Sequence, residues 1–143
     1  MKPVITRPQP VDSVITGTNG TPLTVTCLSV GGYPRQTVGL YKYQTGQNHT
    51  KLVDCNSTSP LNQGLYDVTA TCTLTPIQED KGAKLYCQSS YTGEPTLLEK
   101  SDEVLLQLLS KVSTLAFILL YLDYKFQTNA LAKLKLNLKT IQH

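Results

Sequence analysis

The sequence predicts an all-β protein, built as a two-sheet antiparallel sandwich, followed by an apolar and then basic tail that suits a helix. Cys27 ends one segment of alternating polarity and Cys87 ends another, so each cysteine sits on the inward face of its predicted strand. A disulfide between two sheets requires such a pair of strands. Turn clusters recur between short β-favouring segments, and no helical period precedes residue 109. We therefore expect a sandwich in residues 1–109 and a separate tail in residues 110–143.

The first strands are predicted around a proline-rich entry. Short β-favouring stretches at residues 4–6 and 13–16 are separated by prolines, which cannot donate to a sheet ladder, so together they predict one irregular edge strand. The pair Asn19-Gly20 predicts a hairpin turn into the strand that ends at Cys27.

The next strand follows a turn at Gly31-Gly32-Tyr33-Pro34. Residues 37–43 alternate, with Val38 and Leu40 on one face. Leu40 occupies the position where disulfide-bridged sandwiches of this size usually carry a tryptophan, and the chain contains no tryptophan. Leucine fills apolar space there but covers less of the disulfide.

The second half of the sandwich contains the clearest strand. Residues 44–64 are polar and predict one short edge strand in a long connection, whereas residues 65–74 alternate regularly and direct Cys72 into the core. Cys72 either forms a second bridge with Cys55 or stays free and buried while Cys55 is exposed; geometry rather than spacing decides between these alternatives. One last strand is predicted within residues 97–109.

Composition indicates the secretory pathway. Four cysteines in a short β-rich chain, together with three Asn-x-Ser/Thr acceptors, are typical of an oxidising compartment. We expect glycans on Asn48 and Asn56, where they would shield a sheet edge, rather than on Asn19, whose sequon is followed by Pro22. Residues 1–20 contain no run that resembles a signal peptide, so we interpret the chain as a fragment or isoform of a cell-surface or secreted protein.

The sequence offers no arrangement of residues for catalysis, metal binding or nucleic-acid binding. His49 lies in a sequon loop and His143 is the last residue, so neither is placed to act as a general base. Glu79 and Asp80 lie at a predicted turn, where we expect both to be solvated. Residues 1–109 carry eight Lys or Arg against nine Asp or Glu, so the basic character belongs to the tail. We expect a non-enzymatic protein without a cofactor.

Four motifs carry a resemblance to a known family. They are Leu-Thr-Val-Thr-Cys at 23–27, Gly-Gly-Tyr-Pro-Arg at 31–35, Gly-Leu-Tyr-Asp-Val-Thr at 64–69, and an Asp-x-Gly corner followed by cysteine at 80–87. With them, residues 3–109 resemble the membrane-proximal, constant-like immunoglobulin domain of T-cell costimulatory ligands and butyrophilin-like proteins. The second and third motifs are most similar to the inducible-costimulator-ligand branch.

Leu85 departs from the family pattern. It stands where many immunoglobulin domains have a corner tyrosine, and Tyr86, one position on, is expected to face outward. The corner hydrogen bond is therefore not expected from Tyr86.

The resemblance implies an immunoglobulin-like sandwich that serves as a spacer in a costimulatory or coinhibitory ligand of lymphocyte receptors. Its expected partners are a protein receptor or an adjoining variable-type domain. Because strands alternate in direction, the turns containing Tyr33 and Pro34, and Gly93 and Pro95, are expected at the N-terminal end, in contact with that domain. The alternatives are a secreted or adhesion-type module, acting as a decoy or in cell–cell adhesion, and a cytosolic protein with reduced cysteines.

The tail contains the longest apolar run, residues 112–122, between Lys111 and Asp123. As a helix, this run would reach roughly 16 Å, against a hydrocarbon core of about 30 Å. Residues 130–139 alternate leucine with lysine or asparagine, which also suits a basic strand or a disordered tail. Three alternatives stay open: a weak or partial membrane anchor through residues 112–122, a packed helix, and a tail without a folded role.

Overall fold

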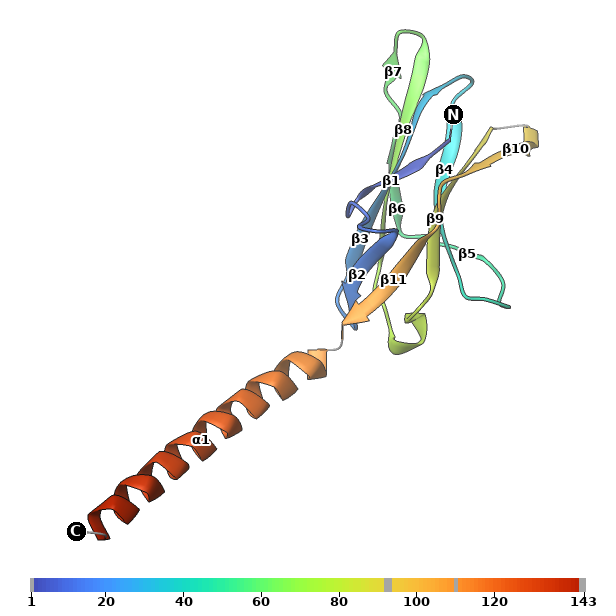
Figure 1. Cartoon of the computed structure of the whole chain (residues 1–143). Coiled ribbons are helices and arrows are strands. Elements are labelled where there is room, and N and C mark those ends of the chain that lie inside the picture. Colours follow the sequence, from blue (N-terminus) through green and yellow to red (C-terminus); the bar gives the residue numbers. More distant parts are fainter. Residues whose placement is uncertain (1, 92–93, 110, 142–143) are drawn as a thin grey trace. The chain divides into compact units, whose positions relative to one another are not determined.

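The computed structural model describes residues 2–91, 94–109 and 111–141, and the chain divides into two compact units, Met1–Leu109 and Ser110–His143 (Figure 1). The first unit is a β-sandwich, which confirms the predicted fold class. Its elements are β1 (Val4–Arg7), β2 (Val14–Thr18), β3 (Leu23–Gly32), β4 (Gln36–Tyr43), β5 (Thr50–Lys51), β6 (Cys55–Thr58), β7 (Leu61–Asn62), β8 (Leu65–Leu74), the 3-10 helix η1 (Gln78–Asp80), β9 (Lys84–Tyr91), β10 (Glu94–Lys100) and β11 (Val104–Leu109).

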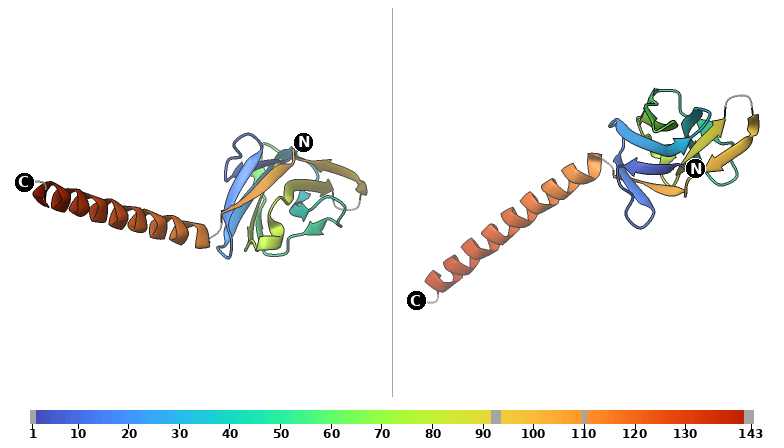
Figure 2. Two further views of the ribbon diagram at one scale, coloured as in Figure 1. Left: turned by 60° about the horizontal axis from the view of Figure 1, so that its bottom comes forward. Right: turned by 90° about the horizontal axis from the view of Figure 1, so that it is seen from above.

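Two sheets face each other across one hydrophobic core (Figure 2). The first has the order β1-β3-β8-β6, with β7 also on β8, and the second has the order β2-β11-β9-β4-β5, with β10 also on β9. The inward residues of alternating strands supply the core, as expected for period-two patterns. Its buried members are Ile15, Val25, Cys27, Val38, Leu40, Val68, Ala70, Cys72, Leu74, Leu85, Cys87, Val104 and Leu106.

The N-terminal segment differs from its prediction because it changes sheets. β1 pairs with β3, whereas β2 pairs with β11 in the other sheet, so the expected single edge strand is two strands. The β2–β11 pair is parallel, which makes the second sheet mixed rather than purely antiparallel. The Asn19-Gly20 turn consequently links the two sheets and is not a hairpin. Gly20 has a φ of 75°, a conformation that glycine adopts without steric cost.

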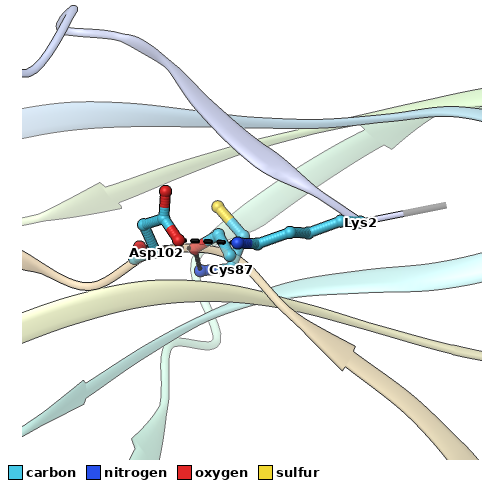
Figure 3. Close-up of polar contacts among 4 residues, drawn as sticks. Lys2, Cys87 and Asp102 are labelled. Atoms are coloured by element: carbon cyan, nitrogen blue, oxygen red, sulfur yellow. Dashed lines mark hydrogen bonds and ion pairs between the residues drawn. The ribbon is translucent and has the colours of Figure 1, made fainter.

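The number of strands differs from the prediction in two further regions, residues 44–64 and residues 97–109. The region predicted to hold one edge strand contains β5, β6 and β7, because short polar segments pair wherever the neighbouring strand leaves an edge free. The predicted last strand is divided into β10 and β11 at Ser101, whose Oγ accepts a hydrogen bond from the Cys87 N–H at 2.8 Å. Next to this break, Lys2 Nζ lies 2.6 Å from Asp102 Oδ1 (Figure 3); exposed ion pairs of this kind contribute little stability.

Two disulfides stabilise the sandwich. Cys27 and Cys87 are joined across the sheets with their Cα atoms 5.9 Å apart. Leu40 lies opposite Cys87 in the β4–β9 register and is fully buried, so it fills the position usually held by tryptophan. Cys55 and Cys72 are also bridged, between β6 and β8 of the same sheet. The alternative in which these two cysteines are free is wrong.

The turn before β9 contributes Asp80 to a partly buried ion pair. Asp80 accepts hydrogen bonds from Lys42 Nζ at 2.7 Å and from the Ile77 N–H at 2.9 Å. The expectation that Asp80 is solvated is therefore wrong; Glu79, its neighbour, is exposed as expected. Lys42 comes from β4, a segment far away in the sequence, so only the tertiary fold could reveal this partner.

The second unit is one helix, α1 (Lys111–Ile141), coloured orange to red in Figure 1. The basic-strand and disordered-tail interpretations of residues 130–139 are wrong. A lone alternating segment has no partner strand, whereas Leu, Ala and Lys all favour the helix. Large apolar side chains between Ile118 and Leu136 are exposed. Over the described part of the chain, no helix is long and apolar enough to cross a membrane.

We predict that removing the inter-sheet disulfide costs more stability than removing the second one. The bridges separate cysteines by 60 and 17 positions, and the chain-entropy relation gives about 4 and about 3 kcal/mol for loops of these lengths. Denaturant unfolding of the Cys27→Ala/Cys87→Ala and Cys55→Ala/Cys72→Ala proteins measures both losses. Equal stability of the wild type and the first variant would contradict this account.

We also predict that Asp80→Ala lowers the free energy of unfolding by about 2–3 kcal/mol, because Lys42 and the Ile77 N–H both lose their charged acceptor. Glu79→Ala is the matched control and should change stability by less than about 0.5 kcal/mol, since the side chain is exposed. Chemical denaturation of both variants is the measurement. A similar effect of the two substitutions would show that the Lys42–Asp80 contact contributes nothing.

Candidate recognition surfaces

One end of the sandwich carries an exposed apolar patch, which we call the end patch: Val30, Tyr33, Leu61 and Leu65. The register places these residues at the same end of the sandwich, because Leu61 of β7 and Gly32 of β3 both lie opposite Tyr66 of β8. Tyr33 follows directly in the turn between β3 and β4 and is 71% exposed. Figure 1 shows the N-terminus, β7 and the start of β8 at this same end of the unit.

Two glycines shape the turn that presents Tyr33. Gly31 has a φ of 74°, and its N–H donates to Asp67 Oδ1 at 2.9 Å. At Gly32, a Cβ atom would lie only 2.5 Å from Nε2 of the buried Gln36 side chain. The Gly31-Gly32 pair therefore suits a left-handed backbone position followed by a close approach to Gln36.

The predicted contact residues of this end are only partly described. Tyr33 and Pro34 are both exposed at the end patch. Gly93 lies outside the described residues, and Pro95 is part of strand β10. Their contact with a neighbouring domain stays a prediction.

A second surface is formed by four rings on the outer side of β4 and β9, which we call the ring cluster: Tyr41, Tyr43, His49 and Tyr86. The Tyr41 and Tyr86 rings stack with centroids 5.4 Å apart, and Tyr43 and His49 stack at 4.0 Å. His49 meets Tyr86 edge-on at 5.6 Å. Stacked and edge-to-face arrangements are the favourable geometries for aromatic pairs.

Tyr86 faces away from the core, as predicted, but other side chains cover this side of the sheet. It is only 2% exposed, and its hydroxyl lies 2.7 Å from His49 Nδ1. The segment after β4 brings His49 back over the strand, which sequence spacing does not reveal. The hydrogen bond of the Tyr86 hydroxyl is thus to a side chain of the loop after β4.

Charged groups surround the ring cluster. The Tyr43 hydroxyl donates to the Glu103 carboxylate at 2.7–2.8 Å, and this hydrogen bond is the main cause that raises the pKa of Tyr43. Burial, followed by the influence of Tyr41 and Glu103, raises the pKa of Tyr86. Lys100 Nζ lies 4.9 Å from the centre of the Tyr86 ring. Both phenols are therefore neutral hydrogen-bonding groups at physiological pH.

The predicted glycan acceptors lie in different environments. Asn48 is exposed in the connection between β4 and β5, beside His49. Asn56 is exposed on β6, the edge strand of its sheet. Asn19 is partly buried, and its N–H donates to the Leu109 carbonyl oxygen at 2.9 Å. Whether these positions carry glycans stays a prediction.

Neither surface has the composition of a metal site. Among the described residues, no group of three or more His, Cys, Asp or Glu side chains is arranged to hold a metal ion. The two surfaces offer aromatic, aliphatic and hydrogen-bonding groups, which are the usual components of protein–protein contacts.

Comparison with known proteins agrees with this fold. Residues 6–96 match the family described as CD80-like C2-set immunoglobulin domain. The search of curated proteins finds no match. A crystal structure of Rst D1-D2 is similar with a TM-score of 0.59 and 20% identity, over 76% of this chain and 48% of that one. The full ectodomain of mouse nectin-like molecule 4 is similar with a TM-score of 0.52 and 16% identity, over 67% of this chain and 31% of that one.

These two structural likenesses concern the fold alone. The chain spans about half the length of the first protein and about a third of the second. The family match covers most of the sandwich and includes both disulfides, Cys27–Cys87 and Cys55–Cys72. This chain belongs to the CD80-like C2-set immunoglobulin domain family.

Proposed function

We propose that this chain is the spacer of a cell-surface recognition protein, of the kind that acts as a costimulatory or coinhibitory ligand of lymphocyte receptors. In this proposal a preceding variable-type domain binds the receptor, and the present sandwich holds that domain away from the membrane. The observation that carries the proposal is the end patch, which exposes apolar side chains at the end where the chain enters the sandwich.

The end patch supports a permanent contact with a neighbouring domain. Covering Tyr33 and Leu61 would stabilise such a contact, since burying one large apolar side chain contributes roughly 1.5–3 kcal/mol. A domain that precedes residue 2 in a longer protein would meet the patch directly. The hydrogen bond from Gly31 to Asp67 holds the Tyr33 turn in place before contact, which lowers the entropy cost of docking.

The sandwich has the properties that a spacer needs. Two disulfides resist unfolding in an oxidising environment. A glycan on Asn56 would cover the β6 edge and prevent pairing with other chains. Signalling specificity would then reside in the preceding domain rather than here.

We predict that Tyr33→Ser loosens the junction between the two domains. In the full-length protein, small-angle scattering should show a broader distribution of inter-domain distances for Tyr33→Ser than for the wild type. Val53→Ser is the matched control, because Val53 is 94% exposed in the connection between β5 and β6. Unchanged scattering of the Tyr33 variant would contradict the spacer proposal. Finding that the full-length protein carries no preceding domain and is released into the medium would favour the secreted or adhesion-type alternative.

We further predict two occupied glycosylation sites. When the chain is secreted behind a heterologous signal peptide, Asn48→Gln and Asn56→Gln should each remove the mass of one glycan, because both side chains are exposed. Asn19→Gln should leave the mass unchanged. Electrophoretic mobility before and after glycosidase treatment is the measurement, and a shift for Asn19→Gln alone would reverse the assignment.

A further inference from the structure

We propose that the first sugar of a glycan on Asn48 packs into a polar hollow beside this residue and fastens the connection between β4 and β5 to the sandwich. The hollow has a volume of about 260 Å³ and is lined by residues from the end of β4, from the connection that contains Asn48, and from η1. Because N-glycans are attached to secreted and cell-surface proteins, this inference rests on the proposed cell-surface role.

The chain on both sides of Asn48 is held by contacts of its own. Before it, the Gln47 N–H donates to the Gln44 carbonyl oxygen at 2.9 Å, which closes a turn. After it, the His49 ring stacks on the Tyr43 ring with centroids 4.0 Å apart. Asn48 itself is exposed and lines the hollow. A sugar attached here therefore starts next to the hollow and loses little further freedom when it packs there.

The opposite wall of the hollow is tied to the sandwich as well. Lys42 Nζ donates to Asp80 Oδ1 at 2.7 Å, and the side-chain amide of Gln44 donates to the Glu79 carbonyl oxygen. These two contacts connect β4 and the segment after it to η1. The charges of Lys42 and Asp80 compensate each other, so the hollow suits a neutral polar group.

The first sugar of an N-glycan, N-acetylglucosamine, has the matching chemistry. It is neutral and carries ring hydroxyls, an acetamide group and an apolar ring face. The lining residues include an aromatic one, Tyr43, and an amide, Gln47; small-molecule sites usually combine such apolar surface with a few polar groups. Sites for drug-sized ligands have volumes of about 300–1,000 Å³, so a hollow of about 260 Å³ suits a group of the size of one sugar.

Asn56 gives a contrast within the same chain. It lies on β6, opposite Thr71 of β8, and the two residues after it, Ser57 and Thr58, are exposed like Asn56 itself. A glycan at this position would extend over the edge of a sheet. We therefore expect the Asn56 glycan to shield that edge without adding much stability, and the Asn48 glycan to stabilise the sandwich.

Proteins with one glycan each test this difference in the full chain. Asn56→Gln keeps the Asn48 glycan, Asn48→Gln keeps the Asn56 glycan, and the double variant has neither. After secretion, an endoglycosidase trims each glycan to one N-acetylglucosamine, and mass spectrometry identifies the occupied residue. The sugar on Asn48 should raise Tm above that of the double variant by about 4–8 °C, the shift expected when a domain of about this size gains one hydrogen bond. The sugar on Asn56 should leave Tm nearly unchanged.

A side-chain variant and a direct measurement locate the contact. Gln47→Ala keeps the backbone hydrogen bond to Gln44 but should remove at least half of the rise in Tm, without lowering the occupancy of Asn48. Gln78→Ala is the matched control, because Gln78 is exposed on η1 but is not among the lining residues. Nuclear Overhauser effects between the sugar and the Tyr43 ring should be visible in the trimmed protein.

Three results would overturn the inference: an unoccupied Asn48, equal Tm shifts from the sugars on Asn48 and Asn56, or an occupied Asn48 whose sugar shows no contact with Tyr43. The last two would leave the proposed spacer role standing, because that role is tested separately by scattering at the end patch. Conversely, unchanged scattering of the Tyr33 variant would contradict the spacer role without affecting the hollow.

Discussion

The bridge between Cys27 and Cys87 is the constraint on which the rest of the sandwich depends. It joins the central strands of two sheets, and both sulfurs lie in a core that excludes water. Leu40 packs at the position of the missing tryptophan, so this core has less aromatic surface than its fold usually provides. With a smaller apolar contribution, the covalent link carries a larger share of the stability. The second bridge, between Cys55 and Cys72, holds the short strand β6 against β8.

The exposed surfaces depend on where the strands of the sandwich end and on which loops fold over them. At the end patch, a glycine turn with a hydrogen bond to Asp67 presents Tyr33 away from the core. On the outer side of the second sheet, the segment after β4 brings His49 back to within 2.7 Å of the Tyr86 hydroxyl and completes the ring cluster. At the break around Ser101, the chain passes from β10, which pairs with β9, to β11, which pairs with β2. The end patch thus lies where regular pairing stops, whereas the ring cluster lies over the regularly paired strands β4 and β9.

Prediction from the sequence succeeds where the pattern is local. The alternation around Cys72 identifies its strand and its inward direction, and both are confirmed. Prediction fails where a hydrogen-bond partner lies far away in the sequence: Asp80 accepts from Lys42, and the Tyr86 hydroxyl contacts His49. It also fails for the short strands between β4 and β8, because pairing of two-residue segments depends on which neighbouring edges are free. For the tail, alternating leucine and lysine suggest a strand, but without a partner strand the helix is the stable form.

The sequence by itself determined the layered all-strand body and the positions of its inward cysteines, because side-chain direction in a strand is set by a period of two. Only the tertiary structure decided that the N-terminal segment crosses from one sheet to the other and that Cys55 reaches Cys72. The alternation of residues in a strand determines which side chains face the core. Which strands pair with one another depends on the free energy of the whole packed domain, which no single segment determines.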